Sequence, residues 1–301
     1  MGRIAIAFLA CAALLSAAPV RSETTVPAVV FERGGDLYAV AINGSRTVRL
    51  TRTRFQEREP AVSPDGSTIA FSRGVGRGHG IWTMNLDGSG RRVVAREGDH
   101  PAWAPDGKTI YFVRYWAPTR YAASCGAIAR TPASGGWIRS VTRPKWPHSH
   151  LDPAVSPDGQ RIAFSDWRGC EGGVSSPRLR IVDVSGRPTG DLSKLRLNDY
   201  AAGTEHSNPA WSPDGERLAF NGFNRNPYLG VANRDGSGER RVSRGGGYDS
   251  PVWSPDGRWI AFASGYSVRI IRPDGTGLRR LARNTRGIEY ELGGWLSRLP
   301  S

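Results

Sequence analysis

The sequence predicts an all-β protein, a six-bladed β-propeller of four-stranded antiparallel blades, with the ring closed by the C-terminal strand pairing into the first blade. Three observations lead to this prediction. A segment ending in Pro-Asp-Gly recurs five times, a short apolar run follows each copy, and a second glycine-containing turn follows each run. Repeats at such intervals are typical of propellers and other repeat folds.

The five copies of the segment are closely alike in sequence. Their last aspartates are spaced by 41, 52, 56 and 42 residues, and the copies occupy residues 59–66, 100–107, 152–159, 208–215 and 250–257. The shorter spacings fit one four-stranded blade, and the longer ones fit a blade with a loop insertion. Proline fixes φ, aspartate bonds its own backbone, and glycine accepts positive φ, so each copy predicts a turn between two strands. The five aspartates are therefore interpreted as turn formers.

The run after each turn is apolar on both faces, as in a strand packed between two layers. These runs occupy residues 69–71, 110–112, 162–164, 218–220 and 260–262. A further strand should end in the second turn, found at residues 87–90, 134–136, 185–186, 235–238 and 274–277. Trp103, Trp211, Trp253 and Trp295 are expected to pack between blades.

A sixth copy of the second turn, at residues 43–45, has no Pro-Asp-Gly segment before it. Gly294-Trp295-Leu296-Ser297 resembles the missing segment. The C-terminal strand is therefore expected to complete the first blade, so that one domain uses nearly all of residues 23–301.

These repeats resemble those of TolB-type propellers, which also occur in the propeller domains of prolyl oligopeptidase-like enzymes. The resemblance covers about residues 28–297. It implies the fold and an exported, periplasmic protein that docks an envelope partner, as TolB docks an outer-membrane-associated lipoprotein. We expect this chain to differ from TolB by lacking the separate N-terminal α/β domain.

The first residues predict a secretory signal peptide. Arg3 precedes an apolar run at residues 4–15, and small residues suit cleavage after Ser22. The run is shorter than the ~20 residues that span a bilayer. Residues 1–22 are thus expected to be removed, leaving no transmembrane segment, with the mature protein in the periplasm or outside the cell.

The chain is strongly basic, with a formal charge of +14; the signal peptide contains Arg3 and Arg21 and no acid, so its removal leaves +12. This charge makes an anionic polymer one candidate partner. Nucleic acid is not expected for an exported protein.

Cys125 and Cys170 are the two cysteines that remain after cleavage. Each is expected in the loop between the second and third strands of adjacent blades, so both loops emerge on one face. We therefore predict a disulfide between them, as an oxidising compartment permits.

The candidate binding residues precede the repeated proline, where the inner strand of each blade begins at one mouth of the channel. They are Glu57, Glu59, Asp99, His100, His150, Asp152, His206, Asn208, Asp249 and Ser250, and the C-terminal strand adds Glu289 and Glu291. No cofactor is required by this set. A divalent metal is the alternative, with His150, His206 and His100 as candidate ligands.

The leading hypothesis is a non-enzymatic, monomeric binding propeller without catalytic residues, which engages a protein or envelope component through the channel mouth and the loops around it. Tyr115-Trp116 and Trp167-Arg168 belong to those loops. The absence of a Gly-x-Ser-x-Gly motif excludes a serine peptidase of the α/β-hydrolase type. The rival hypothesis is a metal-dependent lyase acting on an acidic saccharide in the channel.

Overall fold

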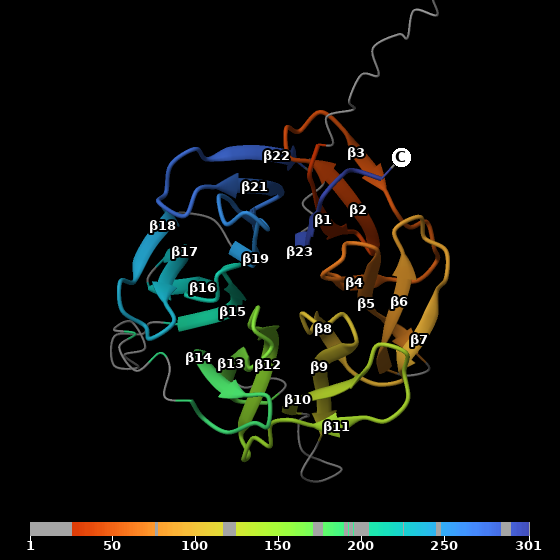
Figure 1. The fold of residues 1–301 in the computed structure, drawn as a ribbon, viewed down its shortest axis with the longest axis vertical. Helices are drawn as coiled ribbons and strands as arrows, with labels where there is room; N and C mark the ends of the chain where they lie inside the picture. The colour runs from red at the N-terminus through yellow and green to blue at the C-terminus, as the bar shows by residue number, and fades with distance from the viewer. Residues whose placement is uncertain are drawn as a thin grey trace, which may run out of the picture.

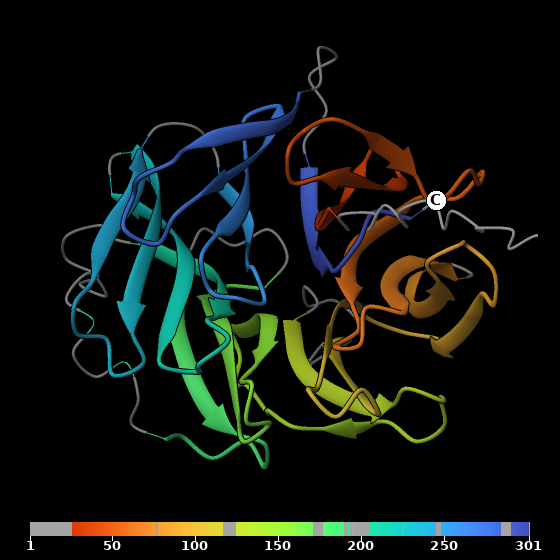
Figure 2. The same ribbon diagram turned by 45° about the horizontal axis from the view of Figure 1, so that its top comes forward.

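The computed structural model describes residues 26–75, 78–116, 125–170, 177–189, 192, 195, 205–224, 226–244, 248–283 and 290–300. The predicted signal peptide, residues 1–22, lies outside these ranges. The described residues form six antiparallel sheets arranged radially around a central axis (Figures 1 and 2). The predicted six-bladed propeller is confirmed.

Each blade is numbered here by its order along the chain, and its strands run from the inner to the outer edge. The first contains β23 (Tyr290–Leu296), β1 (Ala28–Arg33), β2 (Asp36–Ala41) and β3 (Thr47–Arg49); the second β4 (Glu57–Val62), β5 (Thr68–Val75), β6 (Gly78–Asn85) and β7 (Arg92–Ala95); the third β8 (Asp99–Trp103), β9 (Thr109–Trp116), β10 (Cys125–Pro132) and β11 (Arg139–Ser140). The fourth contains β12 (His148–Val155), β13 (Arg161–Arg168) and β14 (Arg178–Asp183); the fifth β15 (Glu205–Trp211), β16 (Arg217–Asn224), β17 (Asn226–Asn233) and β18 (Arg240–Arg244); the sixth β19 (Tyr248–Trp253), β20 (Ile260–Ser264), β21 (Ser267–Ile271) and β22 (Arg279–Arg283).

The ring closes as the sequence predicts. Strand β23 pairs antiparallel with β1, and Ala28 lies opposite Leu296. In the fourth blade the described residues give three strands, and Val182 forms a single bridge with Pro188 on the side of the outer strand.

Apolar side chains fill the space between neighbouring blades in six clusters, one for each pair. One fully buried phenylalanine from the second strand of each blade recurs in them: Phe31, Phe71, Phe112, Phe164, Phe220 and Phe262. Because both faces of each blade are covered, the apolar runs need no polar face.

Four of the six junctions between blades are joined by a tryptophan, as expected from the repeats. The indole Nε1 donates to a carbonyl of the preceding blade at 3.0–3.1 Å, in the pairs Trp103 to Ala61, Trp211 to Ala154, Trp253 to Ala210 and Trp295 to Val252. The aligned positions in the second and fourth blades are Val62 and Val155.

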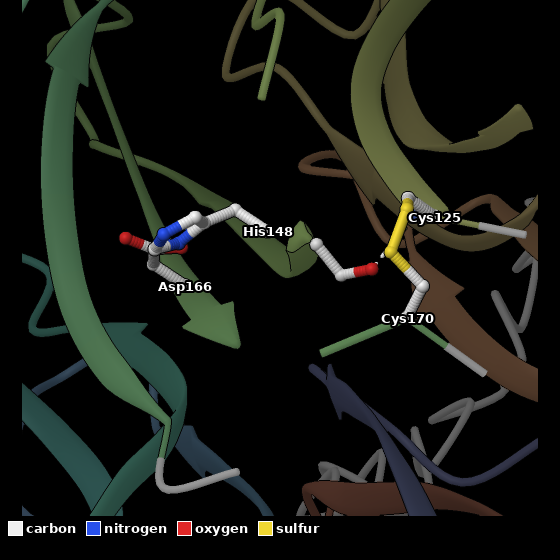
Figure 3. Close-up of a disulfide and its surroundings, with 6 residues drawn as sticks. Cys125, His148, Asp166 and Cys170 are labelled. Atoms are coloured by element: carbon white, nitrogen blue, oxygen red, sulfur yellow. Dashed lines mark hydrogen bonds and ion pairs between the residues drawn. A yellow bond between two sulfur atoms is a disulfide. The ribbon is translucent and has the colours of Figure 1, made fainter. Parts of the chain in front are cut away.

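The junction between the third and fourth blades contains the predicted disulfide instead. Cys125 begins β10 and Cys170 follows β13, and their Cα atoms are 4.6 Å apart (Figure 3). The backbone N–H of Gly126 also donates to Ser149 Oγ at 3.0 Å across this junction.

The two faces of the ring differ in the loops that they contain. The Pro-Asp-Gly turns lie on one, the turn face, where their aspartate carboxylates accept backbone N–H groups two residues on, as in Ser67 to Asp65 at 3.0 Å. The other, the mouth face, contains the start of each inner strand and the end of each second strand, because the register pairs Glu57 with Arg73 and Glu205 with Phe223. The aspartates thus act as turn formers.

The described part of the chain contains no helix that is long and apolar enough to cross a bilayer.

Candidate functional site

A cavity of about 700 Å³ lies along the central axis between the inner strands. Its polar lining comes from all six blades: Glu32, Arg58, Glu59, His100, Asp152, Asn208, Ser250 and Glu291. The repeated prolines and the residues after them line the rest, so polar groups are held in a partly apolar wall.

The residue before each repeated proline has an unusual backbone conformation. Its φ lies between 47° and 53° in Glu59, His100, Asp152, Asn208 and Ser250. Left-handed backbone costs a non-glycine residue roughly 1 kcal/mol or more, and its recurrence at equivalent positions of five blades indicates that the fold maintains it. At the same point the register with the second strand shifts by a β-bulge, as between Arg58 and Ala61.

Hydrogen bonds link these turned residues from blade to blade. The N–H of Glu59 donates to Glu291 Oε2 at 2.8 Å, and the N–H of His100 donates to Glu59 Oε2 at 2.7 Å. His100 Nε2 in turn lies 3.4 Å from Asp152 Oδ1. The side chain of one blade therefore satisfies the backbone donor that the bulge exposes in the next.

Polar residues on the second strands support this ring, and the sequence reasoning missed them. Ser72 donates to Glu59, and Ser165 Oγ donates to Asp152 Oδ2 at 2.7 Å. Ser165 Oγ also accepts the N–H of Asn208 at 3.0 Å. A signal was present, because Ser72 and Ser165 each directly follow the buried phenylalanine of the strand and Asn221 does the same in the fifth blade, where it donates to Asn208 Oδ1 at 3.2 Å.

His100 lies at the centre of a group of carboxylates. Its Nδ1 is 2.9 Å from Asp99 Oδ1 and 3.4 Å from Glu59 Oε1, and its side chain is 31% exposed. Burial opposes the charged form, but the carboxylates of Glu59, Asp99 and Asp152 outweigh it and hold the pKa of His100 well above its usual value. The imidazole is therefore a cation held among acids.

Two further carboxyl groups lie at the junction of the first and second blades. Burial, with a smaller effect of Glu291, raises the pKa of Glu32 to about 7. Burial and the charge of Glu59 also raise the pKa of Glu291. This part of the cavity is crowded with negative charge, which Arg58 partly offsets.

Glu59, Asp99 and His100 offer ligand atoms within 4.8 Å of one another, the one such group of three among the described residues. Carboxylate oxygens and an imidazole nitrogen are ligand types that suit Mn²⁺ or Zn²⁺. Each donor already has a protein partner, so a metal would have to displace the contacts of His100.

The residues three places before the repeated proline do not join this group. Glu57 is fully buried and accepts from Thr53 Oγ1 at 3.0 Å. His206 is fully buried in its blade, with Nε2 3.1 Å from the hydroxyl of Tyr228 and 3.5 Å from Glu239.

His150 packs against Phe164 with the rings tilted and their centroids 4.5 Å apart, and burial lowers the pKa of His150 to about 4. Its Nε2 lies 3.8 Å from Asp166 Oδ1, while His148 Nδ1 lies 2.9 Å from the same oxygen (Figure 3). The histidines proposed together as metal ligands therefore occupy three separate environments. Glu289 and the side chain of Asp249 lie outside the described residues.

Sequence comparison gives two partial relatives, and no family model matches the chain. A protein named TolB homolog from Chlorobium luteolum is 29% identical over 185 residues, 60% of this chain and 39% of that protein. An uncharacterized protein of Agrobacterium fabrum is 32% identical over 173 residues, 52% of each chain. The chain thus covers about half or less of the length of these relatives.

Solved structures give the same fold. TolB from Acinetobacter baumannii superposes with a TM-score of 0.68 at 18% identity, over 90% of this chain and 66% of that one. This chain is a TolB-like six-bladed β-propeller. The fold alone is shared more widely, since a structure of a nidogen/laminin complex gives 0.68 at 11% identity, covering 90% of this chain and 99% of that one. An oligogalacturonate lyase in complex with manganese gives 0.55 at 16%, covering 83% and 71%.

Proposed function

We propose that this TolB-like propeller is exported by a signal peptide at residues 1–22 and acts as a non-enzymatic binding module for a protein of the cell envelope. The partner binds at the mouth face, over the central cavity. The observation that carries this proposal is the ring of side chains turned into the cavity by left-handed residues in five blades. Preorganised polar groups in a partly apolar wall are typical of a recognition site.

The hydrogen bonds suit a binding role. Glu59 and Asp152 each accept from a serine of their own blade, and Glu59 also accepts a backbone N–H from the next blade. These contacts fix the carboxylates in one orientation. Polar groups that are already fixed in one orientation lower the entropy cost of docking a partner.

The test is capture from envelope extract by purified mature protein. We expect a specific protein to be retained by the native chain and lost by a variant that combines Glu59→Gln, His100→Ala, Asp152→Asn and Asn208→Ala. The matched control replaces Trp137 and Leu278 with alanine; both are exposed on the turn face, and capture should be unchanged. Equal capture by the native protein and the mouth variant would contradict the proposal, provided that circular dichroism shows both folded.

The group of Glu59, Asp99 and His100 favours one second candidate, a metal-dependent lyase acting on an acidic saccharide. The basic charge of the chain suits such a substrate. Metal analysis of the purified protein decides between the two. A stoichiometric metal that is lost in His100→Ala but kept in His206→Ala supports the lyase, and a protein that stays metal-free in Mn²⁺ and Zn²⁺ solution excludes it.

A further inference from the structure

Exposed aromatic side chains gather on the mouth face. Among the described residues, seven large apolar side chains are exposed, and only Trp137 and Leu278 belong to the turn face. The other five, between 38% and 61% exposed, come one from each of the second to sixth blades: Phe55, Tyr115, Trp146, Phe223 and Tyr266. Aromatic residues of this kind dominate binding energy in protein interfaces.

The position of each follows from the strand register. Phe55 and Trp146 come just before the inner strands β4 and β12, while Tyr115 and Phe223 lie at the mouth ends of β9 and β16. Tyr266 lies in the turn between β20 and β21. The five side chains therefore lie on the mouth face, one from each of five blades around the cavity. We call them the aromatic rim.

The centre of this rim is acidic although the chain is basic. Five carboxyl groups lie in or beside the cavity, those of Glu32, Glu59, Asp99, Asp152 and Glu291. Among the described lining residues, Arg58 and His100 are the cations, so carboxyl groups outnumber cations even though the pKa values of Glu32 and Glu291 are raised. Tyr115 of the aromatic rim contacts the acidic centre, because its hydroxyl interacts with the carboxyl group of Asp99.

We infer that the mouth face recognises a protein segment in which a lysine or arginine side chain, flanked by apolar side chains, enters the acidic centre while its neighbours pack on the aromatic rim. The carboxylates would receive the cation as charge-assisted hydrogen-bond acceptors, and the rim would exclude water around them. The net positive charge of the chain disfavours segments that are basic throughout, since like charges repel. The inference rests on the proposed function and names the chemistry of its partner.

The test uses a displayed library of short random peptides selected on the intact mature protein, so it does not depend on finding the natural partner. We expect selected peptides to be enriched in lysine or arginine with leucine or aromatic residues beside it. Replacing that basic residue with glutamine should weaken binding about tenfold, the effect expected for one partly desolvated charge contact.

Two variants separate the parts of the surface. Glu59→Gln with Asp152→Asn should abolish the preference for the basic residue, whereas Tyr115→Ala with Phe223→Ala and Tyr266→Ala should weaken basic and glutamine peptides alike. The turn-face control, Trp137→Ala with Leu278→Ala, should leave binding unchanged.

A selection that yields no binders, binders without a basic residue, or binders equally affected by the turn-face control overturns the inference. These outcomes are distinguishable from failure of the proposed function. If envelope capture still depends on the mouth residues while the library shows no basic preference, binding at the mouth stands and the stated partner chemistry is wrong.

Discussion

At the scale of single residues, the indole hydrogen bonds explain why tryptophan recurs after the repeated proline. Trp253 Nε1 donates to the carbonyl of Ala210 at 3.1 Å, and its ring lies in the cluster between the fifth and sixth blades. Trp253→Phe keeps most of the apolar area but leaves a carbonyl without its donor. We expect the free energy of unfolding to fall by about 1–3 kcal/mol in chemical denaturation.

Trp82→Phe is the matched control for that change. Trp82 is partly buried, but its Nε1 has no hydrogen-bond partner in the part of the chain that the structure describes. The same substitution there removes no hydrogen bond. An equal loss of stability in both variants would show that ring size, and not the bond to Ala210, is what matters.

Glu32 makes a second prediction at this scale, from its pKa of about 7 against an ordinary value of 4.5. Between these values the folded state binds more protons than the unfolded state, so stability falls as pH rises through this window. Glu32→Gln removes the cost of the buried charge. Its stability relative to the native protein should therefore increase by up to about 3 kcal/mol from about pH 5 to about pH 8.

Denaturant unfolding at the two pH values measures this change. Glu216→Gln, a replacement at a side chain that is 67% exposed, controls for the loss of one acidic charge. A difference between native protein and Glu32→Gln that does not vary with pH would show that the carboxyl is not destabilised by its burial.

At the scale of elements, the disulfide joins the third and fourth blades. At this junction Val155 occupies the position that is tryptophan in other blades, so no indole hydrogen bond is made there. The disulfide closes a loop of 45 residues, for which chain entropy gives about 4 kcal/mol. Replacing Cys125 and Cys170 with alanine should lower the free energy of unfolding by roughly that amount. Reductant should destabilise the native protein to the same extent and leave the variant unaffected; a native protein indifferent to reductant would contradict the prediction.

The elements were predictable from sequence because each blade is a local unit with its own turn signals. Both the closure by β23 and the pairing of Cys125 with Cys170 followed from the order of those units. The direction in which the side chains at the channel mouth point could not be predicted from the order of the units. A strand that alternates regularly would place Glu57 and Glu59 on one side, but the bulge and the left-handed residue break the alternation.

The same break separates His206 from Asn208, so that one packs inside its blade and the other lines the cavity. The residue types in these pairs do not indicate which side chain faces the cavity, because both members of each pair are polar. The proline that follows restricts the preceding residue, yet it favours extended backbone and not the left-handed form that is observed.

At the scale of the whole molecule, the overall charge and the charge of the cavity have opposite signs, and salt should separate their effects. With a formal charge of +14, the positive side chains repel one another in the folded state, so screening by salt should stabilise the fold. Salt also screens attraction between the acidic centre and a basic peptide. Raising sodium chloride from about 0.02 M to about 0.3 M should therefore raise the melting temperature while weakening binding of a selected basic peptide several-fold.

Sucrose is the control for this experiment, because it stabilises folded proteins by exclusion from their surface without screening charge. It should raise the melting temperature without weakening peptide binding. If salt strengthened both folding and peptide binding, contact with the aromatic rim would outweigh the charge of the centre. Glu59 would then orient the backbone at His100, and Asp152 would hold the hydroxyl of Ser165, through the hydrogen bonds that they accept, and their charge would contribute little to recognition.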